Sequence, residues 1–257
     1  MPIDISALER QQRVLRIVEQ QQRITVNQIV EQFDVSLATA RRDLEVLADQ
    51  GKVQRVHGGA IAVRQAPPEP PVLLRAAEQT TEKARIAQAA ADLIGDGETV
   101  FLSSGTTVLE VARRLRGKHT LTVITNSLLV VNELSNVQNI TVISLGGMLR
   151  HSEMSLIGHI TEQALSELRA DKVILGIRAI DAEQGLTSAY LPETMTDRAI
   201  LKIGREVIVV ADHTKCATVS TAVVAPITAI HTLITDTGTS SDFIQAVQTH
   251  GVRVLVV

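Results

Sequence analysis

A run of prolines near residue 70 divides the chain into two parts with different patterns. Four of the seven prolines lie in the segment 67–71. Proline fixes φ and lacks a backbone donor, so this segment neither continues a helix nor joins the middle of a sheet. Before it, apolar residues repeat with helical spacing; after it, apolar strands alternate with helices. The sequence therefore predicts two domains, 1–64 and 81–257, joined by a linker over 65–80. A surface loop within one domain is the alternative.

The first part carries signals for three helices followed by a hairpin. Two capping boxes, which begin at Ser6 and Thr25, predict the starts of two helices. Ser36 is expected to cap a third helix that runs to about residue 50. Apolar residues on both sides of a Gly-Gly pair then predict a small β-hairpin over 53–63.

This order of helices and hairpin is typical of a winged helix-turn-helix, in which the later helix enters the major groove of DNA. Small and polar residues open that helix, and an arginine pair follows that can contact phosphates or guanine. The segment from Lys52 to Arg64 is basic and has no acidic residue. The residues expected to contact DNA are Ser36, Ala38, Thr39, Arg41, Arg42, Lys52, Arg55, His57, Gly58 and Gly59.

A solvated helix face would also explain the arginine pair. Asp43, Glu45 and Asp49 could neutralise it through pairs along the helix. Residues 1–64 hold nine Lys/Arg against eight Asp/Glu, so charge alone predicts only weak non-specific binding to DNA. The basic hairpin argues against a further alternative, in which this part serves only for dimerisation.

The second part alternates strands and helices. Strands that are apolar on both faces favour a mostly parallel sheet with helices on both faces, an α/β fold. The expected strands cover 99–102, 121–125, 140–145, 172–177, 207–211, 232–235 and 253–257. The expected helices cover 84–94, 107–115, 128–134, 161–168, 193–203 and 242–250.

Polar or glycine-rich turns follow four of these strands. The carboxyl ends of parallel strands meet at one edge of a sheet, where ligands bind. The first turn also opens a helix, whose free amides and neighbouring hydroxyls favour an anion such as phosphate. The four turns contain Ser103-Ser104-Gly105-Thr106-Thr107, Thr125-Asn126-Ser127, Gly146-Gly147 and Asp212 with Lys215.

Arg178 follows another strand and can clamp an anionic group with its planar guanidinium. Structural explanations remain open at this point. Helix capping explains many Ser/Thr-rich turns, Arg178 could pair with Asp181 or Glu183, and Asp212 could pair with Lys215.

Composition argues against several functions. Aromatic residues make up 2% of the chain and Trp is absent, so base stacking of the kind used by RNA-recognition modules is not expected. The single cysteine, Cys216, excludes an internal disulfide and a multi-cysteine metal site, which favours a reducing cytoplasm. No apolar stretch approaches the roughly 20 residues that span a bilayer. We therefore expect no cofactor, no metal and no membrane partner.

Two blocks resemble a known family. Residues 35–44 (VSLATARRDL) and 55–60 (RVHGGA) are similar to the DNA-binding signature of DeoR-type transcriptional regulators, and the Gly-Thr-Thr and Thr-Asn-Ser motifs follow in order. Ala40 departs from the β-branched residue usual in the family. The resemblance implies a winged helix-turn-helix followed by an effector domain similar to ribose-5-phosphate isomerase. It also implies a repressor of a carbohydrate-metabolism operon, controlled by a phosphorylated sugar or related anion.

The resemblance implies roles for single residues as well. The four turns named above and Glu193 would line the effector pocket, and Lys83 would contact its rim. Arg198 matches a recurrent arginine of the family and is likewise expected to bind the effector, as is Arg178. Ser103 stands where many members have Asp, and Arg178 where small residues are common. These two departures imply a more cationic pocket and a more strongly anionic ligand.

We expect a regulator rather than an enzyme, with operator DNA and a phosphosugar as partners. Reading a two-fold operator requires a homo-oligomer, a dimer or tetramer. The alternative is a sugar-phosphate isomerase-like enzyme with an appended helical domain, which would use Asp212 or Glu193 as its base. The chain shows no Ser-His-Asp signature and no metal-ligand spacing among its seven histidines. The motif of the basic hairpin favours the regulator.

Overall fold

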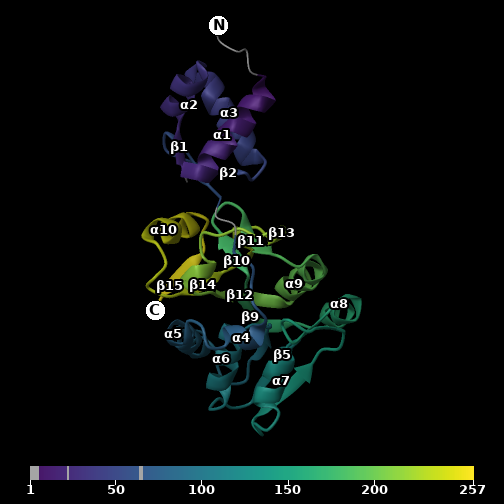
Figure 1. Cartoon of the computed structure of the whole chain (residues 1–257). Coiled ribbons are helices and arrows are strands. Elements are labelled where there is room, and N and C mark those ends of the chain that lie inside the picture. The colour runs from purple at the N-terminus through teal and green to yellow at the C-terminus, as the bar shows by residue number, and fades with distance from the viewer. Residues whose placement is uncertain (1–5, 22, 64–65) are drawn as a thin grey trace. The chain divides into compact units, whose positions relative to one another are not determined.

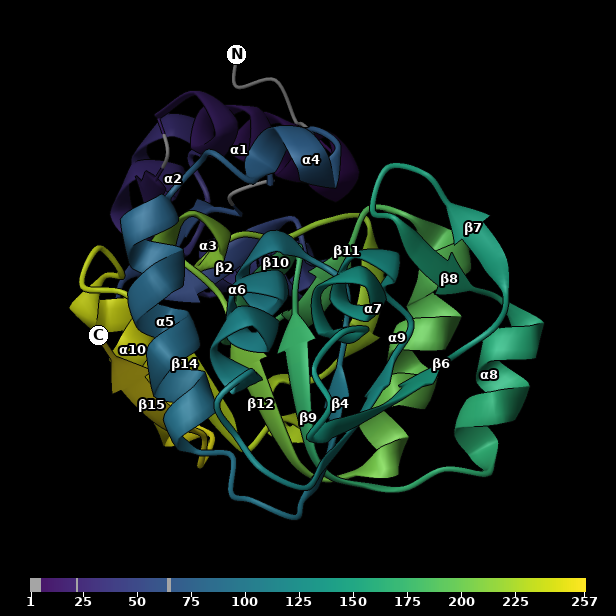
Figure 2. The ribbon, with the colours of Figure 1, turned by 90° about the horizontal axis from the view of Figure 1, so that it is seen from below.

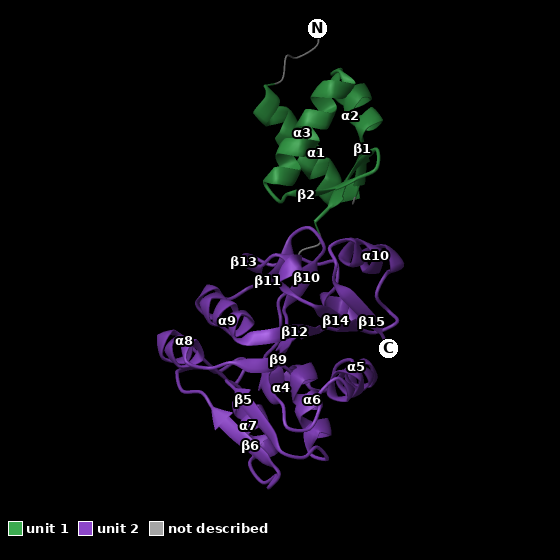
Figure 3. Ribbon diagram, turned by 180° about the vertical axis from the view of Figure 1, so that it is seen from behind, with its two compact units in different colours: residues 1–64 green, residues 65–257 purple. Residues whose placement is uncertain are grey.

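The computed structural model describes residues 6–21, 23–63 and 66–257, and the chain divides into two units, residues 1–64 and 65–257 (Figures 1 and 3). The first unit has one hydrophobic core of its own, and the second has two. The division falls directly before the prolines.

The first unit contains three helices and a three-stranded antiparallel sheet with strand order β1-β3-β2. Its elements are α1 (Ala7–Gln21), β1 (Arg23–Thr25), α2 (Val26–Phe33), α3 (Leu37–Asp49), β2 (Val53–Val56) and β3 (Gly59–Ala62). Thr25 and Gln28 form the predicted capping box at α2. The hydroxyl of Ser36 accepts a hydrogen bond from the Thr39 N–H at 3.1 Å and caps α3. The predicted winged helix-turn-helix is confirmed.

The hairpin turn differs by one residue from the prediction. His57 and Gly58 form the two-residue turn, with Gly58 at φ +81°, and Gly59 already begins β3. Strand β1, which the sequence did not indicate, lies directly against Gly59. A Cβ atom there would lie 2.1 Å from the carbonyl oxygen of Ile24, so only glycine permits this pairing.

The second unit is built on a seven-stranded sheet in which every pair of neighbours is parallel. In spatial order the strands are β15 (Arg253–Val256), β14 (Thr232–Thr235), β12 (Gly204–Val210), β9 (Ala170–Gly176), β4 (Thr99–Leu102), β5 (Leu121–Thr125) and β6 (Ile140–Ser144). All seven predicted strands are present, with ends that differ by at most three residues.

Helices cover both faces of this sheet (Figures 1 and 2). One face is covered by α5 (Thr80–Asp92), α6 (Thr106–Leu115) and α7 (Leu128–Leu134). The other is covered by α8 (His159–Ser166), α9 (Leu191–Ile203) and α10 (Ser241–Thr249). The strand side chains alternate accordingly: Val100 and Leu102 belong to one core, and Phe101 to the other. The predicted α/β class is confirmed.

Several short elements were not indicated by the sequence. They are the hairpin β7 (Met148–Arg150) and β8 (Ser155–Ile157), the antiparallel sheet β10 (Ala179–Asp181), β11 (Gly185–Ser188) and β13 (Ala222–Ala225), the helix α4 (Val72–Arg75), and the 3-10 turns η1 (His213–Lys215) and η2 (Ile227–Ala229). Each of them has only three or four residues, which is too short for hydrophobic periodicity to give a signal.

The proline-rich segment packs against the second unit. We call residues 66–71 the strap. The Ala66 N–H donates to the Val219 carbonyl at 2.8 Å, and directly after the strap the Val72 N–H donates to Ser152 at 2.7 Å. The strap is thus held to this unit near both of its ends, within the stretch that the sequence predicts to be a linker.

Candidate functional site

The residues expected to contact DNA lie mainly on the exposed surface of the first unit. Eight of the ten are exposed, Thr39 is half-buried and Gly59 is buried. Within the described residues, Arg41 and Arg42 have no ion pair and no side-chain hydrogen bond. Both guanidinium groups are therefore available to a phosphate or a base. Arg64, the last basic residue of the hairpin region, lies outside the described residues.

Asp43 does not neutralise this arginine pair. It faces the core side of α3, where its carboxylate accepts hydrogen bonds from Arg10 Nε at 2.5 Å and Gln11 Nε2 at 2.9 Å. Both donors belong to α1. The acidic residue nearest in sequence to the arginines thus joins two helices and is not available to pair with them. The alternative that Asp43 neutralises them is wrong.

A cavity of about 380 Å³ lies at the carboxyl ends of the parallel strands in the second unit. Along the chain, β4, β5 and β6 are added one after another toward one edge of the sheet. The chain then returns to β9, beside β4, and adds β12, β14 and β15 toward the opposite edge. The strand order therefore reverses between β4 and β9. Ligands of open parallel sheets bind at such a reversal. The turns after β4, β5, β9 and β12 all line the cavity.

Most of the predicted effector-site residues meet in this cavity. It brings together Ser103, Ser104, Gly105, Thr106, Thr107, Asn126, Arg178, Glu193, Asp212 and Lys215, with Lys83 beside them. Thr125, Ser127, Gly146, Gly147 and Arg198 are not part of the lining.

These five residues make structural contacts instead. Thr125 donates from its hydroxyl to the Leu102 carbonyl at 2.7 Å. Ser127 caps α7. Gly146 accepts a hydrogen bond from Thr161, and a Cβ on Gly147 would lie 2.1 Å from the same hydroxyl. Arg198 donates to the carbonyls of Val223 and Val224 and so ties α9 to β13.

The start of α6 forms one wall of the cavity. Its cap residue, Gly105, has no side chain to accept from the first amides of the helix. Ser103 is occupied differently: its hydroxyl accepts from the Gly176 N–H at 3.0 Å and thereby joins β4 to β9. The free amides of the first helical turn, flanked by Thr106 and Thr107, are therefore available to an anion.

Two buried side-chain atoms of the cavity have no partner within the described part of the chain. They are Asn126 Oδ1 and Arg178 Nε. Asn126 donates from Nδ2 to the Leu156 carbonyl at 3.1 Å, which leaves its oxygen as the free acceptor. Buried polar atoms without partners are rare and costly. A ligand with a hydroxyl and an anionic group would satisfy both atoms.

Glu69 of the strap is a lining residue that the sequence did not indicate. Its carboxylate lies 2.5 Å from Lys215 Nζ, 2.9 Å from an Arg75 nitrogen and 3.5 Å from an Arg178 nitrogen. Lys215 thus pairs with Glu69 rather than with Asp212, which accepts from Thr214. Arg178 pairs with Glu69 rather than with Asp181 or Glu183. Both alternatives left open by the sequence are wrong.

Further charged residues line the rest of the cavity. Arg150 pairs with Glu193 and lies 4.7 Å from the centre of the Tyr190 ring. Burial raises the pKa of Asp197 to about 7. Burial likewise lowers the pKa of Lys83, whose ammonium donates to the carbonyls of Arg75 and Glu78.

Counting all charged lining residues, the cavity is not cationic. Its five cations are Arg75, Lys83, Arg150, Arg178 and Lys215, and its six carboxylates are Glu69, Glu78, Glu153, Glu193, Asp197 and Asp212. The expected excess of positive charge is therefore absent in this state. Carboxylates from segments that the sequence did not assign to the pocket offset Arg178.

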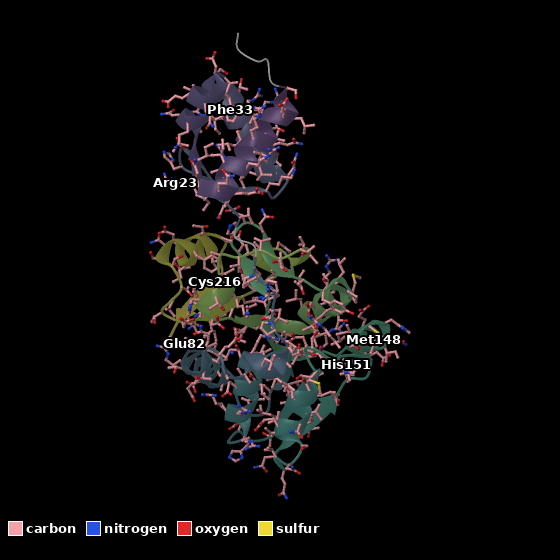
Figure 4. The ribbon with its side chains drawn as sticks, in the orientation of Figure 1. Arg23, Phe33, Glu82, Met148, His151 and Cys216 are labelled. Atoms are coloured by element: carbon pink, nitrogen blue, oxygen red, sulfur yellow. The ribbon has the colours of Figure 1, made fainter. Side chains whose placement is uncertain are left out.

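Cys216 lies inside the second unit (Figure 4), and burial raises the pKa of its thiol to about 11, which makes it a poor nucleophile. Among the residues described, no group of three or more His, Cys, Asp or Glu side chains could hold a metal ion. No helix in the described ranges is long and apolar enough to cross a membrane.

An exposed helix-turn-helix face and a ligand-sized cavity at the sheet reversal together define a DNA-binding regulator with a small-molecule sensor. Comparison with protein families agrees. The DeoR-like helix-turn-helix domain matches residues 10–66, and the DeoR C-terminal sensor domain matches residues 78–237. The chain belongs to the DeoR family of transcriptional regulators, as its motifs indicated.

Relatives match along nearly the whole chain. Transcriptional repressor AccR of Agrobacterium fabrum is 37% identical over 91% of both chains. The glycerol-3-phosphate regulon repressor of Escherichia coli K12 is 35% identical over 95% of this chain and 97% of its own. A putative aga operon transcriptional repressor of Escherichia coli O157:H7 is 33% identical over 97% and 93%.

Similarity to solved structures is weaker. Ribose 5-phosphate isomerase A from Methanocaldococcus jannaschii has a TM-score of 0.38 at 18% identity, over 52% of each chain. That TM-score is too low to assign the second unit to the isomerase fold.

Proposed function

We propose that this protein is a transcriptional repressor of a carbohydrate-metabolism operon, and that a phosphorylated sugar or related anion bound in its second unit controls DNA binding. One observation carries the proposal: the cavity at the sheet reversal combines a free helix start with an unpartnered guanidinium nitrogen, Arg178 Nε. The names of the relatives support the same class of regulation.

The test measures DNA binding by the full chain with and without ligand. A labelled duplex from the promoter region beside its gene is titrated at low salt, followed by glycerol 3-phosphate and a panel of phosphorylated sugars. We expect nanomolar to micromolar binding that at least one of these compounds changes by roughly 5–150-fold. A chain with no affinity for any such duplex at low salt would refute the proposal.

Two double variants test the functions of the two units separately. Replacing Arg41 and Arg42 by alanine should abolish DNA binding and leave the ligand-induced thermal shift intact. Replacing Arg178 and Lys215 by alanine should abolish the change in DNA affinity that ligand causes, because the cations expected to hold the anionic group are gone. A regulator needs both results, because each unit performs one of the two functions.

We propose further that the second unit is not an enzyme. The two carboxylates best placed as a base are already engaged: Asp212 by Thr214, and Glu193 by Arg150. An aldose–ketose isomerase requires a carboxylate free to take a proton from a substrate carbon. A coupled isomerase assay with phosphorylated pentoses and hexoses should show no turnover, and measurable turnover would reverse this assignment.

The working form that we propose is a homo-oligomer in the cytoplasm, where the operator DNA is. A two-fold operator pairs with a two-fold protein. Sedimentation of the full chain, alone and with operator DNA, tests this: a monomer bound singly to one half-site would contradict it.

A further inference from the structure

A carboxylate of the strap lies inside the effector cavity. Glu69 is the only acidic residue of the strap, and two prolines flank it on each side. Prolines hold the backbone extended, so the side chain is presented at a fixed place. With a side-chain exposure of 15%, Glu69 is largely withdrawn from solvent.

Two of the cations that it contacts have no other ionic partner within the described residues. Arg178 and Lys215 have side-chain exposures of 9% and 20%, and each makes its only ion pair with Glu69. A buried cation that loses its partner is strongly destabilising. The strap can therefore leave the cavity at low cost only when another anion replaces its carboxylate.

The fit between Glu69 and Arg178 is incomplete. The closest approach is 3.5 Å, too long for a hydrogen bond, and Arg178 Nε has no partner in the part of the chain that the structure describes. A phosphate group has three terminal oxygens, which can accept hydrogen bonds from Arg178 and Lys215 at the same time. The carboxylate of Glu69 has only two oxygens, and the strap restricts their position. A phosphate would thus satisfy the guanidinium better than Glu69 does.

We propose that Glu69 is a built-in competitor that occupies the subsite for an anionic group of the effector, and that effector binding expels the strap. The idea rests on the proposed function and adds its regulation. The strap begins at residue 66, three residues after Val63, the last described residue of the first unit. Its release frees six residues of extended chain, roughly 19 Å, and thereby changes how the DNA-binding unit is anchored.

The first test measures phosphate affinity in the full chain. Inorganic phosphate and glycerol 3-phosphate are titrated calorimetrically into the wild type, Glu69→Gln and Glu133→Gln. Glu133 is a matched control because its side chain is also 15% exposed and pairs with two arginines, Arg113 and Arg116, outside the cavity. We expect Glu69→Gln to bind at least one of these anions roughly 5–20-fold more tightly, and Glu133→Gln to match the wild type within about 2-fold.

The outcomes separate the two proposals. If the wild type binds phosphate and Glu69→Gln binds it equally or more weakly, the competitor idea is wrong while anion sensing stands. If no protein binds either compound, anion sensing itself fails, and the competitor idea fails with it.

The second test follows the strap directly. It has only two backbone N–H groups, those of Ala66 and Glu69, because its other residues are prolines. The Ala66 N–H donates to the Val219 carbonyl. We expect saturating phosphate to accelerate hydrogen exchange at Ala66 in the wild type, and exchange to be fast in Glu69→Gln even without phosphate. Slower exchange at Ala66 with phosphate would mean that the strap closes over the ligand, which overturns the proposal.

Discussion

Replacing Arg10 by methionine should remove a large part of the stability of the DNA-binding unit. Asp43 is 4% exposed at its side chain and would lose two donors, Arg10 Nε at 2.5 Å and a second guanidinium nitrogen at 3.3 Å. Only Gln11 would remain. Breaking a buried pair in this way costs about 3–5 kcal/mol. A unit of this size has a total stability of about 3–10 kcal/mol, so Arg10→Met should remove between about a third and all of it.

Urea unfolding of the full chain, followed by circular dichroism and by operator binding, measures this loss. The second unit has its own cores and serves as an internal reference. Arg13→Ala is the matched control on the same helix. Its pair with Glu9 is exposed, at 46% and 52%, and its removal should cost less than about 1 kcal/mol.

A second variant checks the cause. In Arg10→Met combined with Asp43→Leu no buried charge remains, so most of the lost stability should return. If Arg10→Met costs no more than Arg13→Ala, or if the double variant is no more stable than Arg10→Met, the buried pair is not what holds α1 on α3.

Three more predictions concern Arg41 and Arg42, Gly59, and Asp197. Arg41→Ala and Arg42→Ala should each weaken operator binding and reduce the slope of log affinity against log salt by about 1, with an unchanged melting temperature. Gly59→Ala should destabilise the first unit by about 1–3 kcal/mol in urea unfolding, because the new Cβ would lie 2.1 Å from the Ile24 carbonyl oxygen. The pKa of Asp197 is about 7 in the folded chain and has its ordinary value of 3.8 in the unfolded chain, so the stability of the wild type decreases as the pH rises from about 4 to about 7. Asp197→Asn should therefore melt at a similar temperature near pH 4 and at least ~3 °C higher at pH 8; equal melting temperatures at both pH values would contradict the raised pKa.

The sequence predicted the strands, helix caps and turns that depend on residues close together in the chain. The seven strands of the parallel sheet are continuous apolar segments, and their ends are marked by polar turns. The caps at Thr25 and Ser36 also require only residues three positions apart. The turn that opens α6 could be assigned to the cavity for the same reason, because a strand, a glycine and a helix start follow one another directly.

The strap contact could not be predicted in this way. Glu69 and Lys215 are 146 positions apart, and nothing in the proline-rich segment indicates which cation it meets. The prolines predict an extended conformation, but conformation does not specify the packing partner.

The angular positions of residues around α9 could have corrected one predicted site residue, Arg198. Glu193 and Asp197 are four residues apart and therefore share a face, whereas Arg198 lies about 100° further round the helix. Both carboxylates line the cavity, and Arg198 lies outside the lining. If Glu193 lines the pocket, helix geometry predicts that Asp197 lines it too and that Arg198 does not.

The charge balance of the cavity determines which compounds can replace the strap. With Glu69 in place, six carboxylates face five cations, and the raised pKa of Asp197 leaves part of that carboxyl population protonated near pH 7. Without Glu69, Arg178 and Lys215 have no anionic partner, and a neutral sugar cannot supply one. Glycerol should therefore leave hydrogen exchange at Ala66 unchanged under conditions where glycerol 3-phosphate accelerates it. If glycerol were as effective, the displacing interaction would lie at the hydroxyl-binding side, around Asn126, and not at the cations.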